Sequence, residues 1–233
     1  MRSETPVVLA LKGVEAGYGF GRTAWPDFFD PANPASGRVN VDGGLAGATL
    51  GANVQSGHFL FGVEGDWMWS AIRGNQNIPF TGALAPGGTI LDSKVNWLAT
   101  ASGRAGFVIA DKLLLFGKAG VAVADERHSL NQTVSNPTGA VSLSGSAVHT
   151  GIVVGAGAEY ALGGNWSIKA EYDYIKMSDQ AFTGVGTASG GLLIVGSMPF
   201  TNQFSKQSQD LQLVKFGANY HFNPGSTAVS ARY

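Results

Sequence analysis

The sequence contains no cysteine, which excludes disulfides, thiolate catalysis and cysteine-ligated zinc sites. No stretch reaches the ~18 uninterrupted apolar residues of a membrane-spanning helix, and no segment shows convincing helical periodicity. Charged residues make up only 13% of the chain and the net charge is −1, so no overall field attracts nucleic acid. These absences argue against a helical membrane protein and against a nucleic-acid partner.

Glycine is abundant instead, with 34 of the 233 residues against a usual share of about 7%. The first residues, "MRSETPVVLALKG", contain an apolar stretch from Val7 to Leu11. This stretch is shorter than the roughly 7–15 apolar residues of an export signal. We therefore expect an export signal upstream of the numbered chain.

Apolar residues alternate with small or polar residues in eight segments, which is the pattern of β-strands with two different faces. Each segment is long enough for the ~9–11 residues of a tilted membrane-spanning strand. The segments are 12–21, 44–55, 58–72, 94–109, 113–124, 149–162, 166–176 and 210–222.

The connections between these segments alternate between short and long. The short connections are "SG" (56–57), "ADK" (110–112) and "GGN" (163–165), and the long ones are 22–43, 73–93, 125–148 and 177–209. Short turns on one side and long loops on the other are typical of a barrel that crosses a bilayer. The prediction is an all-β fold: one eight-stranded antiparallel up-and-down transmembrane β-barrel over residues 1–222, with a C-terminal tail over 223–233.

The two faces of the segments differ in a way that predicts their surroundings. One face is heavily aromatic, as in "FLFGVEGDWMW" (59–69), and we expect it, including Val63 and Val95, to contact lipid. Rings near segment ends are expected at the membrane interface, where N–H and O–H groups reach headgroups. These are Tyr18, Trp67, Trp69, Trp97, Trp166, Tyr172, Tyr174, Tyr220 and Phe222.

The other face carries charge and is expected to line a polar lumen. Its acids and bases could form a catalytic cluster, but mutual neutralisation in an interior salt-bridge network is the favoured interpretation because buried charges persist only when paired. Asn96 is assigned to the same face. The charged residues of this predicted network are Glu15, Glu64, Asp66, Arg104, Lys118, Glu159, Lys169, Glu171, Asp173 and Lys215.

The four histidines, His58, His128, His149 and His221, do not show the spacing of a zinc site. We predict no metal, no cofactor and no catalytic residue. Two alternatives stay open: a membrane-embedded lipid hydrolase using His149 with Ser144 or Ser146, and a soluble lipocalin-like binding barrel.

Five stretches carry a family resemblance: "GVEAGYGFG" (13–21), "FLFGVEGD" (59–66), "ATASGRAGFVIADKLLLFGKAGVAVA" (99–124), "VGAGAEYALGGNWSIKAEYDYIKM" (154–177) and "VKFGANYHF" (214–222). They resemble the small opacity-like, OmpA-like outer-membrane β-barrels of Gram-negative bacteria. The resemblance implies a surface or envelope protein, or a weak small-solute pore, that contacts outer-membrane lipid and lipopolysaccharide.

The same resemblance implies assembly by the outer-membrane insertion machinery, which recognises a terminal aromatic residue. Phe222 and Tyr233 both remain candidates for that signal. A monomer with a possible extracellular ligand at its loops is expected.

Overall fold

The computed structural model describes residues 7–25, 37–79, 87–110, 112–135, 138–190 and 197–222, and ten antiparallel strands account for most of them. The described residues contain no helix long and apolar enough to cross a membrane. The expected C-terminal tail lies outside these residues. The strands are β1 (Val7–Ala24), β2 (Arg38–Ser56), β3 (Phe59–Ser70), β4 (Arg73–Pro79), β5 (Gly87–Ile109), β6 (Leu113–Ser135), β7 (Thr138–Gly163), β8 (Trp166–Met177), β9 (Gln180–Gly190) and β10 (Ser197–Phe222).

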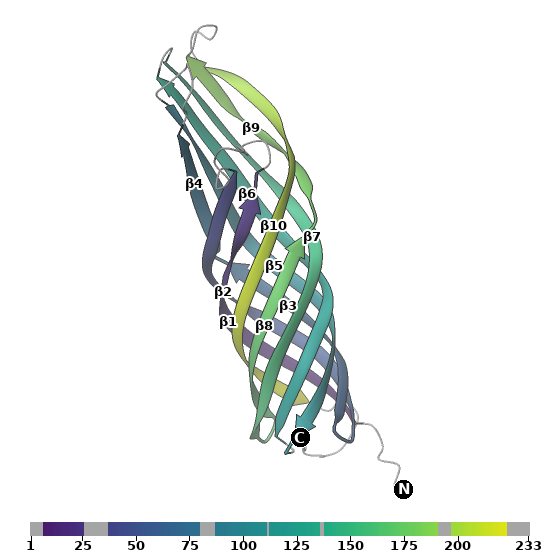
Figure 1. Cartoon of the computed structure of the whole chain (residues 1–233). Coiled ribbons are helices and arrows are strands. Elements are labelled where there is room, and N and C mark those ends of the chain that lie inside the picture. The colour runs from purple at the N-terminus through teal and green to yellow at the C-terminus, as the bar shows by residue number, and fades with distance from the viewer. Residues whose placement is uncertain are drawn as a thin grey trace.

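The strands close into a ring of eight (Figure 1). The order is β1-β10-β8-β7-β6-β5-β3-β2, and β2 pairs back onto β1. The other two strands prolong members of the ring: β4 follows β3 after a two-residue break, and β9 follows β8 in the same way. The predicted eight-stranded antiparallel barrel is confirmed.

The three short connections gather at one end of the barrel, which we call the turn end (Figure 1). Gly57 and Gly164 have positive φ angles of 58° and 63°, and Ala110 has a φ of 51°. Residues in this left-handed region let a strand reverse within very few residues. Asp111, in the middle of the predicted "ADK" turn, lies outside the described residues.

The strands are much longer at the opposite end than the sequence analysis predicted. Large parts of 73–93, 125–148 and 177–209, expected as loops, are strand: β6 continues to Ser135, and β7 begins at Thr138. Parts of those connections lie outside the described residues, as do residues 26–36 of the first one. In Figure 1 the strands β4, β5, β6, β7, β9 and β10 rise beyond the ends of β1 and β2. We call this part the extension.

The sequence did not predict the extension because the polarity of its two faces is reversed relative to the lower barrel. Its outward side chains are often polar, and many of its inward ones are apolar. On β6, for example, Arg127 points outward and Leu130 is buried. Outward side chains there are often Ser, Asn or charged, so the contrast that reveals a lipid-facing strand is lost. The extension has the pattern of a sheet whose outer face meets water.

Two predicted face assignments are wrong for one local reason. A β-bulge lies between Val95 and Trp97 on β5, and it shifts the pairing with β6. A bulge adds a residue to one strand and so reverses the alternation beyond it. Val95 is therefore buried instead of lipid-facing, and Asn96 turns away from the lumen to donate a hydrogen bond to Asp125 (2.8 Å).

Candidate functional site

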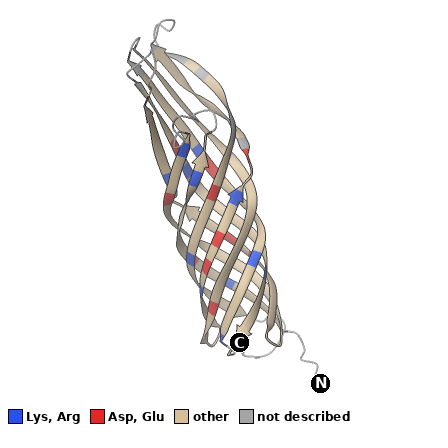
Figure 2. Cartoon of the chain, viewed as in Figure 1, with Lys and Arg blue, Asp and Glu red and all other residues tan. Residues whose placement is uncertain are grey.

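The ten predicted lumen charges all lie inside the barrel, and none is more than 5% exposed. Figure 2 shows acidic and basic positions side by side along the strands. Lys215 on β10 pairs in register with Glu171 on β8, and Lys169 on β8 with Glu159 on β7. Alternation places all of them on one face, and closure of the ring brings that face together as a network.

Two lysines hold the carboxylates of β3 and β8 together. The Lys118 amino group lies 2.6 Å from Glu171 and 3.0 Å from Asp66. The Lys215 amino group lies 2.7 Å from Glu171 and 2.9 Å from Asp173. Because each amino group contacts several carboxylates, every carboxylate of this set has a cation beside it.

Arg104 extends the charge network toward the turn end of the lumen. Its Nη1 lies 3.0 Å from Glu64 and 3.3 Å from Glu159, and its Nε donates a hydrogen bond to Asn53 (2.9 Å). The guanidinium also lies 5.3 Å from the ring centroid of Phe116. Arg104 is thus packed on a ring as well as paired with two acids.

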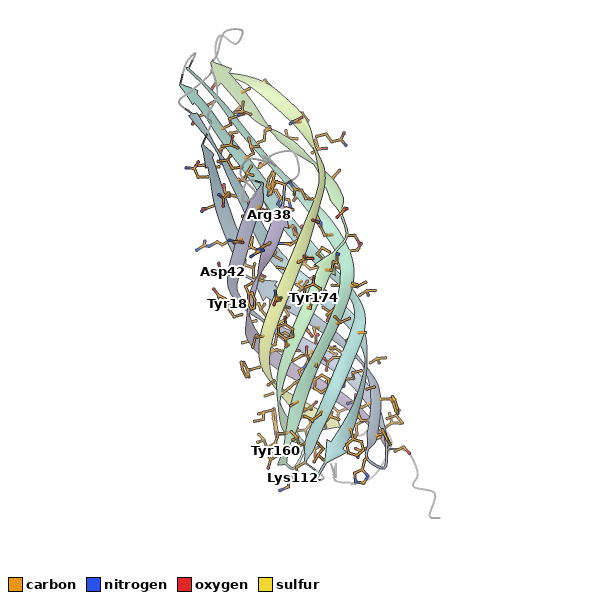
Figure 3. The ribbon with its side chains drawn as sticks, viewed as in Figure 1. Tyr18, Arg38, Asp42, Lys112, Tyr160 and Tyr174 are labelled. Carbon is orange, nitrogen blue, oxygen red and sulfur yellow. The ribbon has the colours of Figure 1, made fainter. Side chains whose placement is uncertain are left out.

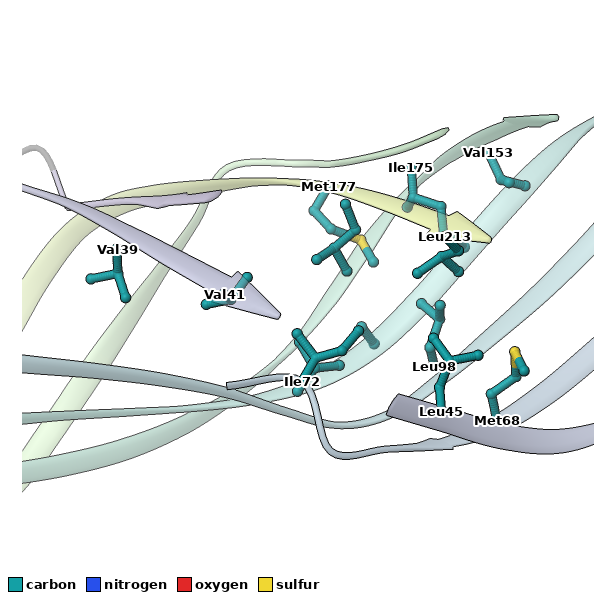
Figure 4. Packing of buried hydrophobic residues seen from close by; sticks show 14 of the residues in the cluster. Val39, Val41, Leu45, Met68, Ile72, Leu98, Val153, Ile175, Met177 and Leu213 are labelled. Atoms are coloured by element: carbon teal, nitrogen blue, oxygen red, sulfur yellow. The ribbon is translucent and has the colours of Figure 1, made fainter. Parts of the chain in front are cut away.

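Apolar layers lie on both sides of the network, and the sequence analysis did not predict them. Toward the turn end the layer comprises Leu60, Val108, Leu114 and Phe116. On the other side a larger cluster fills the lumen, and Figure 4 shows part of it, with Leu45, Met68, Leu98, Val153, Ile175 and Leu213 near one another. These residues alternate with outward apolar residues, so their inward direction is not visible in the pattern.

Inward glycines make room for polar side chains of the neighbouring strand. A Cβ at Gly155 would lie 2.0 Å from the Asp173 carboxylate, and one at Gly62 would lie 2.1 Å from the Asn53 amide oxygen. The space beside these glycines is therefore already filled by side chains. Charged side chains and packed apolar layers together occupy the lumen at mid-height.

Ser167, Glu159 and His221 form a contact group near the turn end. Ser167 Oγ and His221 Nε2 are 2.8 Å apart, and Glu159 Oε1 lies 2.9 Å from the same Nε2. In a catalytic triad the acid holds the nitrogen opposite the one that serves the serine. Here both partners meet one nitrogen, so the group lacks that geometry.

The pair considered for a lipid hydrolase is wrong. His149 is buried in the lumen, whereas Ser144 and Ser146 are exposed on the outer face of the same strand, β7. Alternate residues of a strand point to opposite faces, so neither serine can share a site with His149. The sequence spacing of the histidines gave no sign of a cluster, but the rings of His128 and His149 lie 6.0 Å apart.

The predicted interface aromatics all lie on the outer surface, in two groups. Trp166 and Tyr220 contact each other near the turn end, with ring centroids 5.2 Å apart, and Trp67 stacks on Trp97 at 4.6 Å. Figure 3 shows two of the predicted rings, Tyr18 and Tyr174, near mid-height, and one further tyrosine, Tyr160, at the turn end.

An apolar outer band separates these two levels. Phe59 and Trp69 are about ten residues apart on one strand, and at a rise of about 3.4 Å and a tilt of about 40° this spans about 25 Å, the height of the apolar band of outer-membrane barrels. Within it Val63 is 63% exposed. Above it the outward side chains become charged, beginning with Asp42, Arg73 and Lys94.

A closed ring with an aromatic-edged apolar band outside and paired charges inside defines an outer-membrane β-barrel protein. The chain belongs to the family described as "outer membrane protein beta-barrel domain", whose model matches residues 10–222. Its place is the bacterial outer membrane.

Two comparisons agree with this assignment. The "31 kDa outer-membrane immunogenic protein" of Brucella melitensis is 26% identical over 220 residues, covering 90% of this chain and 81% of the relative. The outer membrane protease OmpT of Escherichia coli is similar in structure, with a TM-score of 0.51 over 92% of this chain and 96% of OmpT. At 6% sequence identity, the likeness to OmpT is one of fold alone.

Proposed function

We propose that this protein is a non-enzymatic structural and surface protein of the outer membrane whose lumen is closed to solutes. The observation that carries the proposal is the buried charge network lying between two apolar layers. An eight-stranded barrel has an interior only just wide enough for side chains to fill. Opening this one would require several buried ion pairs to separate at once, which is costly.

The proposed orientation places the turn end in the periplasm and the extension outside the cell. Long connections of outer-membrane barrels are extracellular and short ones periplasmic. The Brucella relative is named an immunogenic protein, which is in keeping with a surface-exposed extension. An extracellular ligand, if there is one, would meet the protein on this extension.

The outer surface at the base of the extension supports a contact with lipopolysaccharide. Arg73, Lys94 and Arg127 lie in direct register on β4, β5 and β6, all exposed and outward. None of the three has an ion pair within the described part of the chain. Like charges directly opposite each other destabilise a sheet, so bound anionic headgroups would stabilise this row. We also expect assembly as a monomer by the outer-membrane insertion machinery.

Conductance in planar lipid bilayers tests the closed lumen. We expect the wild-type protein to show at most small, intermittent openings. The folded fraction of Arg104→Ala should open more often because Glu64 and Glu159 lose their common partner. Arg22→Ala is a matched control, since Arg22 is an exposed base on the outer surface. Large and steady channels from the wild-type monomer would contradict the proposal.

A further inference from the structure

A second polar cluster lies in the upper lumen, separate from the charge network. Glu126 and His128 on β6 and His149 on β7 all point inward, and none is more than 1% exposed. Glu126 pairs in register with Ala147, two residues from His149. The closed wall therefore brings together three side chains that are potential metal ligands.

The spacing of their ligand atoms suits a metal ion. Glu126 Oε2 lies 3.4 Å from His128 Nε2 and 3.9 Å from His149 Nε2, and one ligand atom from each residue falls within 4.8 Å of the others. Zinc binds nitrogen and carboxylate oxygen at about 2.0–2.2 Å in a tetrahedral arrangement. Ligand atoms around zinc are then about 3.3–3.5 Å apart, so only small side-chain adjustments are needed.

Neighbouring side chains orient two of the three ligands. Ser93 Oγ lies 3.1 Å from His128 Nδ1 and accepts a hydrogen bond from the Trp25 indole (3.3 Å). Because Ser93 Oγ meets Nδ1, the opposite nitrogen, Nε2, is directed at Glu126. A histidine whose second nitrogen is held by a hydrogen bond is the usual arrangement around protein-bound metals.

Glu126 has a partner of the same kind. The side-chain amide of Gln209 is oriented with its nitrogen toward Glu126. That nitrogen donates a hydrogen bond to Glu126 Oε2 (2.8 Å), and the amide oxygen of Gln209 accepts one from Thr23 (3.1 Å). Gln209 and Thr23 come from β10 and β1, on the opposite side of the ring. The carboxylate is thus fixed by the barrel wall and not only by its own strand.

His149 is the ligand whose polar atoms are least satisfied. Neither ring nitrogen has a hydrogen-bond partner of standard geometry in the part of the chain that the structure describes, although the Ser178 backbone lies beside the ring. A buried polar group without a partner is costly. A metal at Nε2 would supply the missing interaction.

We infer that Glu126, His128 and His149 bind a divalent transition metal, with Zn²⁺ as the best match to two imidazoles and one carboxylate. Three protein ligands leave a fourth position for water. The other group of clustered carboxylates, Glu64, Asp66 and Glu171, is a different case because Lys118 already lies within 3.6 Å of all three. The inference does not depend on whether the lumen conducts.

The test is metal binding by the full chain folded into detergent micelles or lipid, with Zn²⁺ present during refolding in one sample and added afterwards in another. We expect one tightly held Zn²⁺ per folded chain after removal of free metal. Co²⁺ in place of Zn²⁺ should give the visible absorption of a tetrahedral nitrogen and oxygen site. No retained metal in either sample would overturn the inference.

Matched variants identify the ligands. His128→Gln and His149→Gln should lose the retained metal and the Co²⁺ absorption, whereas His221→Gln, another buried histidine beside a glutamate, should keep both. Heat-modifiable gel migration establishes that each variant is folded. Equal retention by all variants, or loss in His221→Gln alone, would contradict the assignment.

Ser93→Ala tests the same metal site if a ligand variant does not fold. Removing the hydroxyl leaves the three ligands in place and takes away the hydrogen bond to His128. Loss of such an outer partner typically weakens metal affinity by about 10- to 100-fold. An affinity unchanged from wild type would count against the inferred role of His128.

Discussion

At the scale of single residues, the lumen depends on side chains that fit beside glycines. Gly155→Ala should destabilise the barrel because its Cβ would lie 2.0 Å from Asp173 and 2.8 Å from the Tyr172 backbone oxygen. The Tyr172 backbone cannot move without disturbing its pairing, and overpacking of this kind costs about 1–3 kcal/mol. The urea midpoint of unfolding in lipid vesicles measures the effect.

Gly103→Ala is the control for that prediction. Gly103 lies on the outer face of β5, and a Cβ there would have no neighbour within 4 Å. We expect its midpoint to equal or slightly exceed that of the wild type, since alanine restricts the unfolded chain. Equal destabilisation by both substitutions would contradict the packed-lumen description.

Arg104 is the residue whose replacement should lower the free energy of unfolding most. Arg104→Ala leaves Glu64 and Glu159 buried without their common cation, and breaking a buried pair from one side typically costs about 3–5 kcal/mol. The loss should show as a lower urea midpoint and a smaller folded fraction on gels. Arg22→Ala, on the outer surface, should change stability by less than about 1 kcal/mol.

At the scale of strands, the central feature is the change of outer surface between the lower barrel and the extension. Val63 on β3 and Val185 on β9 are nearly equally exposed, at 63% and 59%, but the first lies in the apolar band and the second in the extension. Val63→Arg should destabilise the folded state by about 2–4 kcal/mol, as expected for Arg at mid-bilayer depth. Val185→Arg should cost little, and similar losses at both positions would show that the boundary is misplaced.

The sequence predicted those strands whose outer and inner faces differ most. The inward direction of the charges from Glu15 to Lys215 and the outward direction of rings such as Trp69 follow from the alternation of apolar and charged residues around them. The apolar layer of Leu114 and Phe116 was not predicted, because its neighbours on the strand are apolar too.

Other features depend on the pairing between strands, which alternation alone does not reveal. The bulge at Val95 is one of them. The proximity of His149 to Glu126 is another, since the two residues are 23 positions apart in the chain and meet only through the β6 and β7 register. The extension was missed for a third reason: with water outside, its small and polar outward residues resemble those of a loop.

At the scale of the whole molecule, the orientation of the barrel can be tested with epitope tags. Tags inserted at Gly57 or Gly164, in the short turns, should be inaccessible to antibody on intact cells and become accessible once the outer membrane is permeabilised. Protease added outside should cleave, if anywhere, in the long connections. Labelling of the turn tags on intact cells would reverse the orientation.

Lipid is expected to cover the lower barrel and not the extension, and fluorescence quenching measures this directly. Because the chain has no cysteine, single cysteines at Val63 and Val185 can carry a fluorophore without any background labelling. In vesicles with brominated acyl chains, fluorescence at position 63 should be strongly quenched, while fluorescence at position 185 should match that in unbrominated vesicles. Equal quenching at both positions, or none at position 63, would contradict this placement of the membrane.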